Sequence, residues 1–258
     1  MNFSTLIKTK IFSRNNSNNN YNKYHFFNNI VGYDDIKELF RRTIISSADK
    51  QIHILLCGPP ASAKSLFMQH LIKLENSYFT LGSHSSKSGM IDALFEKQPR
   101  YLIVDEIDKM SPKDQTVLLS LMETGIIAET KYKRAREIQL KTSVFATANE
   151  TKKLLQPLLT RFSVLHLPPY TFEEFRKITQ RVLCYEEECI DIDIADFISD
   201  AVWSKMKSAN IRDCIRIGHM VAATAASANK EPLKKADALW FIETFLKYNN
   251  NQHTKTIE

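Results

Sequence analysis

The segment Gly58–Ser65, with the sequence GPPASAKS, has the composition and order of a phosphate-binding loop. It follows an apolar run and opens a helical pattern, so backbone N–H groups at the start of that helix can hold phosphates. Lys64 would reach the terminal phosphates, and the Ser65 hydroxyl would ligate Mg²⁺. Ala61 and Ala63 stand where such loops usually carry glycine. An alanine can serve there if its backbone is not in a conformation reserved for glycine.

A pair of acids follows at the end of another apolar run, YLIV, at Asp105 and Glu106. Asp105 is expected to hold Mg²⁺, and Glu106 to orient and deprotonate an attacking water. Two adjacent acids also occur in solvated turns, but their position downstream of a phosphate loop favours nucleotide hydrolysis.

Apolar runs of strand length alternate with helical patterns, which predicts a parallel sheet flanked by helices, an α/β fold. The five expected strands cover 52–57, 78–82, 101–105, 143–148 and 163–167. After Pro168 and Pro169 the pattern is purely helical and begins with a capping box of Thr171 and Glu174. We expect a tail over 1–28, a nucleotide-binding core over 29–169, a helical lid over 170–249 and a second tail over 250–258.

Composition limits the function classes. The 258 residues carry a formal net charge of +6, which is compatible with an anionic partner but does not identify one. The four cysteines show no zinc-site spacing, and no apolar run is long enough for a membrane span. These features predict a cytoplasmic or nucleoid-associated protein. The first 28 residues are rich in asparagine and free of acids, so they are expected to be disordered. Organelle targeting by this basic segment is the alternative.

Several motifs together resemble the AAA+ superfamily of ATPases, in family order from residue 29 to about 225. The resemblance implies a three-layer P-loop core followed by a helical lid, with ATP and Mg²⁺ bound between them. Asn149, at the end of FATANE, resembles the polar sensor that places the lytic water. Arg161 in QPLLTRF resembles an arginine finger, and Arg212 in NIRDCIRIGHM resembles the lid sensor. The nucleotide contacts implied are Ile30 and Val31 at the adenine, the loop residues Gly58, Pro59, Pro60, Ala61, Ser62, Ala63, Lys64, Ser65 and Leu66, and Asp105.

The arginine finger implies assembly. By resemblance, Arg161 would reach the γ-phosphate held by a neighbouring subunit. The enzyme would then be a homo-oligomeric ring, expected to be a hexamer.

The segment 125–141, GIIAETKYKRAREIQLK, is expected to form a hairpin with KYKRAR at its tip. A hairpin at this place resembles that of Holliday-junction branch-migration ATPases and minichromosome-maintenance helicases. DEIDKM and the AKS ending of the loop also resemble the latter. The hairpin residues with possible DNA contacts are Lys131, Tyr132, Lys133, Arg134 and Arg136, which suit phosphate binding and base stacking.

Three functions stay open. The first is a ring ATPase that remodels DNA, as a helicase or branch-migration motor. The second is a chaperone-like remodeller of a protein complex, in which the hairpin grips a protein partner. The third is a scaffold that binds nucleotide without hydrolysis, against which Glu106 and Arg161 argue.

Overall fold

The computed structural model describes residues 26–46, 50–131, 134–187, 190–228 and 235–249. Most of the two predicted tails, 1–25 and 250–258, lies outside the described residues. Phe27, which was expected in the first tail, is fully buried against Phe40 and Phe67. The packed core therefore begins before the expected boundary at residue 29, because two adjacent aromatic residues follow the asparagine-rich segment.

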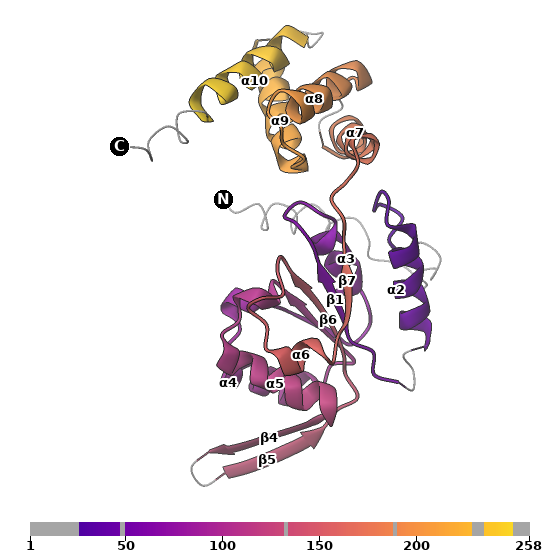
Figure 1. The fold of residues 1–258 in the computed structure, drawn as a ribbon, viewed down its shortest axis with the longest axis vertical. Coiled ribbons are helices and arrows are strands. Elements are labelled where there is room, and N and C mark those ends of the chain that lie inside the picture. The colour runs from indigo at the N-terminus through magenta and orange to yellow at the C-terminus, as the bar shows by residue number, and fades with distance from the viewer. Residues whose placement is uncertain (1–25, 47–49, 132–133, 188–189, 229–234, 250–258) are drawn as a thin grey trace.

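A parallel five-stranded sheet forms the centre of the molecule, as predicted (Figure 1). Its strand order is β2-β3-β6-β1-β7. Its strands are β1 (Ile54–Cys57), β2 (Ser77–Leu81), β3 (Tyr101–Asp105), β6 (Ser143–Ala148) and β7 (Ser163–His166). The central strands β1 and β6 are buried throughout. Both faces of the sheet are therefore covered, as expected for parallel strands that read as continuous apolar runs.

Two helical layers cover the sheet. The elements of the α/β part besides the strands are α2 (Asp34–Ser46), α3 (Lys64–Leu71), α4 (Lys87–Lys97), α5 (Pro112–Glu123), α6 (Gln156–Leu159) and the 3₁₀ turns η2 (Gly82–His84) and η3 (Ile107–Lys109). One core cluster joins Phe40 and Phe67 to Phe145 of the sheet, and the other joins Leu94 and Leu118 to the opposite face. This is the predicted three-layer α/β/α architecture. Ser111 caps the start of the α5 helix, where its hydroxyl accepts the backbone N–H of Asp114.

A separate hairpin of β4 (Ile126–Lys131) and β5 (Arg134–Gln139) precedes β6, and the two strands are antiparallel. It extends from the α/β part at the end farthest from the C-terminal helices (Figure 1). The strands pair as far as Lys131 and Arg134. The paired part therefore extends into the segment 131–136 that we expected to form the tip.

The helical part comprises α7 (Phe172–Gln180), the π-helical segment η4 (Arg181–Glu187), α8 (Ile192–Ser204), α9 (Ile211–Ala228) and α10 (Lys235–Asn249). The predicted capping box of Thr171 and Glu174 is present at the start of α7. In the connection to the sheet, the Tyr33 hydroxyl donates to the Pro168 carbonyl at 2.7 Å. Among the described residues, no helix is long and apolar enough to cross a bilayer. The division into domains remains a prediction.

Candidate nucleotide site

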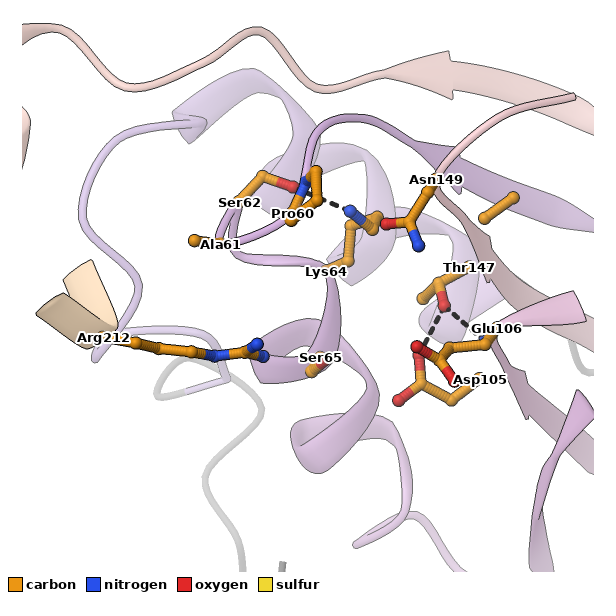
Figure 2. Close-up of a pocket in the computed structure, with 11 residues that line it drawn as sticks. Pro60, Ala61, Ser62, Lys64, Ser65, Asp105, Glu106, Thr147, Asn149 and Arg212 are labelled. Carbon is orange, nitrogen blue, oxygen red and sulfur yellow. Dashed lines mark hydrogen bonds between the residues drawn. The ribbon is translucent and has the colours of Figure 1, made fainter. Parts of the chain in front are cut away.

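The phosphate-binding loop, the acid pair Asp105 and Glu106, and Asn149 meet at the carboxyl ends of β1, β3 and β6, because parallel strands all end at the same edge of a sheet. Arg212 of the α9 helix reaches the site from the helical part (Figure 2). A cavity of about 90 Å³ that opens to solvent lies here. Its lining residues are Pro60, Ala61, Ser62, Lys64, Ser65, Asp105, Glu106, Thr147, Ala148, Asn149 and Arg212.

Lys64 is the first residue of α3 and is largely buried in the loop. Its ammonium donates to the carbonyls of Gly58 and Pro59, both at 2.7 Å, and to the Ser62 hydroxyl at 3.2 Å. Burial lowers the pKa of Lys64, while the nearby acidic groups of Cys57 and Asp105 oppose this shift. The ammonium thus joins the turn of the loop to the start of the helix, at the place where a phosphate would be bound.

The two alanines of the loop have different backbone conformations. Ala63 has a φ of −65° and a ψ of 7°, which any residue adopts without strain. Ala61 has a φ of +64°, in the left-handed region that favours glycine. The expected condition for an alanine, a backbone not reserved for glycine, is therefore met at position 63 but not at position 61.

Thr147 of β6 holds the two acids in place, a contact that sequence reasoning missed. Its hydroxyl donates to Asp105 Oδ1 and accepts the backbone N–H of Glu106 at 2.9 Å. Figure 2 shows both bonds. Glu106 adopts a φ of 55° and a ψ of 48°, which turns the chain directly after the strand. A threonine within a wholly buried strand was the available signal, since a buried hydroxyl needs a partner.

The donors present fit Mg²⁺ bound together with phosphates. Ser65 and Asp105 offer oxygen ligands on the same cavity, beside the lysine of the loop. In the described part of the chain, no three or more His, Cys, Asp or Glu residues form a metal-binding group. The oxygen donors of Ser65 and Asp105 suit Mg²⁺, which commonly takes one or two protein ligands and completes its coordination with phosphate and water. Asp108 adds a buried carboxylate nearby, and its Oδ1 has no hydrogen-bond partner among the described residues.

Asn149 and Arg212 line the same cavity although they come from opposite parts of the molecule. Asn149 follows directly after β6. Arg212 lies in the first turn of α9, where its backbone N–H donates to Asn210 Oδ1. Its side chain points across the cavity toward Ser65 (Figure 2). A cation from the helical part is thus placed opposite the phosphate-binding loop.

Some predicted site residues do not line this cavity. Ile30 is buried in the core. Arg161 donates to the Pro157 carbonyl at 2.6 Å and forms an ion pair with Glu123 of α5. The remaining predicted contacts outside the described lining are Val31, Gly58, Pro59, Ala63 and Leu66. Gly58 instead packs closely on the chain after β7, since a Cβ there would lie 2.8 Å from the Leu167 carbonyl oxygen. The nucleotide contacts assigned to these residues remain predictions.

The hairpin residues are described only in part. Tyr132 and Lys133 lie outside the described residues, as do the side chains of Lys131 and Arg134. Arg136 is described, and it forms ion pairs with Asp92 and Glu129.

Solved structures support the fold. A proline-to-glycine variant of RuvB from Thermotoga maritima is 20% identical, with a TM-score of 0.68 over 84% of this chain and 71% of that one. The structure of the RuvB Holliday junction branch migration motor, from the same organism, is 22% identical with a TM-score of 0.64, over 83% and 70% of the two chains. At this identity the likeness establishes the AAA+ fold alone.

Sequence relatives identify the family. DNA replication licensing factor MCM4 of Oryza sativa subsp. japonica is 30% identical over 142 residues, 48% of this chain and 16% of that protein. Mcm2 of Drosophila melanogaster is 27% identical over 176 residues, 53% of this chain and 20% of that protein. The chain thus spans about a fifth of the length of these relatives. The model of the MCM P-loop domain matches residues 9–201, which is well over half of the 258 residues, and the chain therefore belongs to the MCM P-loop domain family.

Proposed function

We propose that this protein is a Mg²⁺-dependent ATPase that works as a ring-forming motor on DNA. The observation that carries the proposal is the convergence of Lys64, Asp105 and Glu106 with Asn149 and Arg212 on one cavity. These groups come from three strand ends and a helix of the C-terminal part. Together they offer a phosphate cradle, a metal ligand, a base and two polar groups for the terminal phosphate.

In this proposal the chain's own residues bind and orient the reactants. The start of α3 and Lys64 hold the phosphates, with Ser65 and Asp105 as ligands for the metal ion. Bound Mg²⁺ would neutralise charge on the phosphate oxygens. Glu106 accepts a proton from the attacking water, which Asn149 helps to orient. Arg212 brings the helical part against the nucleotide, so hydrolysis would change how the two parts pack.

The proposal that the protein forms a ring depends on the position of Arg161. This arginine is held by Pro157 and Glu123 and does not line the cavity described for its own chain. An arginine finger acting in trans would have such a position, because it must reach the nucleotide of a neighbouring subunit. We propose a homo-oligomeric ring, with six subunits as the expected number.

DNA as the substrate rests on the hairpin and on the family. The licensing factors that resemble this chain are named for DNA replication, and the RuvB structure for the Holliday junction. The basic residues at 131, 133 and 134 give the end of the hairpin a charge that suits phosphates. A DNA motor would act in the nucleus or at a nucleoid.

The test is steady-state ATP hydrolysis with and without single-stranded, duplex and four-way-junction DNA at two salt concentrations, with Lys64→Ala as the blank. Turnover that rises with DNA and loses this stimulation at high salt supports the DNA motor. Turnover that no DNA changes contradicts it and favours the protein remodeller. Tight ATP binding without turnover contradicts the ATPase itself.

A further inference from the structure

Arg136 connects the β4–β5 hairpin to helix α4. Its Nε donates to Glu129 Oε2 of the neighbouring strand at 2.8 Å, and Glu129 is its direct cross-strand partner. Its Nη2 also contacts Glu129 and forms an ion pair with Asp92 of α4. The guanidinium carbon lies 4.3 Å from the ring centre of Phe95, one turn further along α4. A single side chain thus bonds to the hairpin and to the helix beside it.

These contacts occupy the guanidinium in a way that a lysine could not. Two of its nitrogens bind carboxylates while its central carbon lies over an aromatic ring, a combination that suits the forked guanidinium of arginine. The Glu129 side chain is only 11% exposed, so it needs a cation beside it. The hydrogen bonds to Asp92 and Glu129 raise the pKa of Arg136. Arg136 is therefore bound within the protein, whereas a phosphate contact would require these donors to be released.

Helix α4 also leads back to the catalytic end of β3. It follows the η2 turn, in which a Cβ on Gly82 would lie 2.2 Å from the carbonyl oxygen of Glu106. Ser86 caps the helix, and the Lys87 backbone N–H is bound by Asp114 of α5 at 2.7 Å. The turn that precedes α4 thus lies against the backbone of the proposed base, and Asp92, near the middle of α4, contacts the hairpin.

We propose that Arg136 is a positioning residue that fixes the hairpin on α4, and that this contact couples DNA at the hairpin tip to hydrolysis at Glu106. Arg136 makes no phosphate contact in this arrangement. The proposed coupling between DNA and hydrolysis rests on the proposed DNA-dependent ATPase activity. The proposal that Arg136 fixes the hairpin on α4 does not depend on that activity. In the sequence alone, Arg136 was grouped with the DNA contacts because of its charge.

The experiment compares Arg136→Lys and Asp92→Asn with the control Lys131→Gln. Arg136→Lys keeps the charge but loses the fork and the stacking, and Asp92→Asn removes an acid that does not belong to the hairpin. Both should raise amide hydrogen exchange in 126–131 and 134–139, by up to about tenfold for Arg136→Lys. Both should reduce DNA-stimulated turnover at saturating DNA and leave basal turnover unchanged.

Salt dependence separates fixing the hairpin from binding phosphate. Lys131→Gln should lower the slope of log affinity against log salt by about 0.7–0.9, the contribution of one phosphate contact, and leave hairpin exchange unchanged. Asp92→Asn and Arg136→Lys should keep the wild-type slope.

Either of two results would overturn the proposal. The first is that Arg136→Lys shows the hydrogen exchange and the DNA-stimulated turnover of the wild-type protein, since a positive charge alone would then be enough to hold the hairpin. The second is wild-type exchange and stimulation in Asp92→Asn, because α4 would then have no part in holding the hairpin. If the wild-type protein shows no DNA stimulation, the proposed function and the coupling fail together. The exchange measurement would still decide whether Arg136 fixes the hairpin.

Discussion

The nucleotide site and the β4–β5 hairpin are held in different ways. In the site, a buried sheet places Asp105, Thr147 and the loop, and short hydrogen-bonded contacts join neighbouring strands. The hairpin is a two-stranded ribbon outside that sheet, and Arg136 joins it to α4 through its ion pair with Asp92. An isolated pair of strands has little stability of its own. Substitutions in the site should therefore remove groups that hydrolysis needs. Substitutions that release the hairpin should instead change its position relative to the α/β part.

This comparison predicts two classes of variant. Changes in the site should reduce turnover whether or not DNA is present. Changes in the hairpin should reduce only the part of the turnover that DNA stimulates. The following predictions test the first class, and the Arg136 experiment tests the second.

The largest effect is expected for Arg161→Ala, which should lower turnover by about 10³-fold or more, as loss of an arginine finger does. Mixing it with Lys64→Ala should restore part of the activity. In a mixed ring, some intact loops meet an intact finger from their neighbour. ATP hydrolysis across a series of mixing ratios measures the rescue, with Arg42→Ala as an exposed arginine control. Absence of rescue at every ratio would contradict action in trans.

Glu106→Gln should lower turnover by about 10² to 10⁴-fold, because an amide cannot take a proton from water. ATP binding should persist, since Lys64 and the start of α3 are unchanged. Binding is measured by calorimetry and turnover by phosphate release, both with and without DNA. Unchanged turnover would remove Glu106 as the base.

Thr147→Val should have a smaller effect, about 10- to 100-fold on turnover, which is typical when the partner that orients a metal ligand is lost. The substitution conserves shape but leaves the Asp105 carboxylate and the Glu106 N–H without the hydroxyl between them. Thr147→Ser should recover most of the activity. A raised Mg²⁺ requirement in Thr147→Val would indicate that Asp105 is the group affected, and wild-type turnover would show that neither acid needs the bond.

Local patterns made the site predictable, and contacts distant in sequence limited the prediction. The loop and the acid pair combine residue types whose chemistry is evident from their spacing. Thr147 was missed because its partners lie about forty positions upstream, on a strand whose neighbour in the sheet the sequence does not specify. The sequence did not reveal that Arg136 binds Asp92 and Glu129, because charge alone does not identify its partners, and its contact with DNA stays a prediction. Phe27 was assigned to the disordered tail because the segment before it is rich in asparagine, although phenylalanine itself favours a buried position.

The five strands were predicted because each is a continuous apolar run in the sequence. The hairpin was predicted because apolar and polar residues alternate in both of its strands. In α2, Leu39 is 39% exposed while its neighbour Phe40 is buried. Trp240 of α10 is 61% exposed although it is a large apolar residue. Apolar type alone does not decide burial, because folded surfaces retain much apolar area.

The smallest predicted effect separates the two alanines of the loop. Ala61→Gly should stabilise the protein by about 0.5–1 kcal/mol, because it relieves the left-handed φ of +64° at the cost of a more flexible unfolded chain. Ala63→Gly should destabilise it by a similar amount, since that backbone is already relaxed and the methyl group is buried. Urea unfolding of both variants measures the difference. Opposite signs would show that the loop tolerates alanine before the lysine but is strained two residues earlier, and equal signs would contradict the conformational argument.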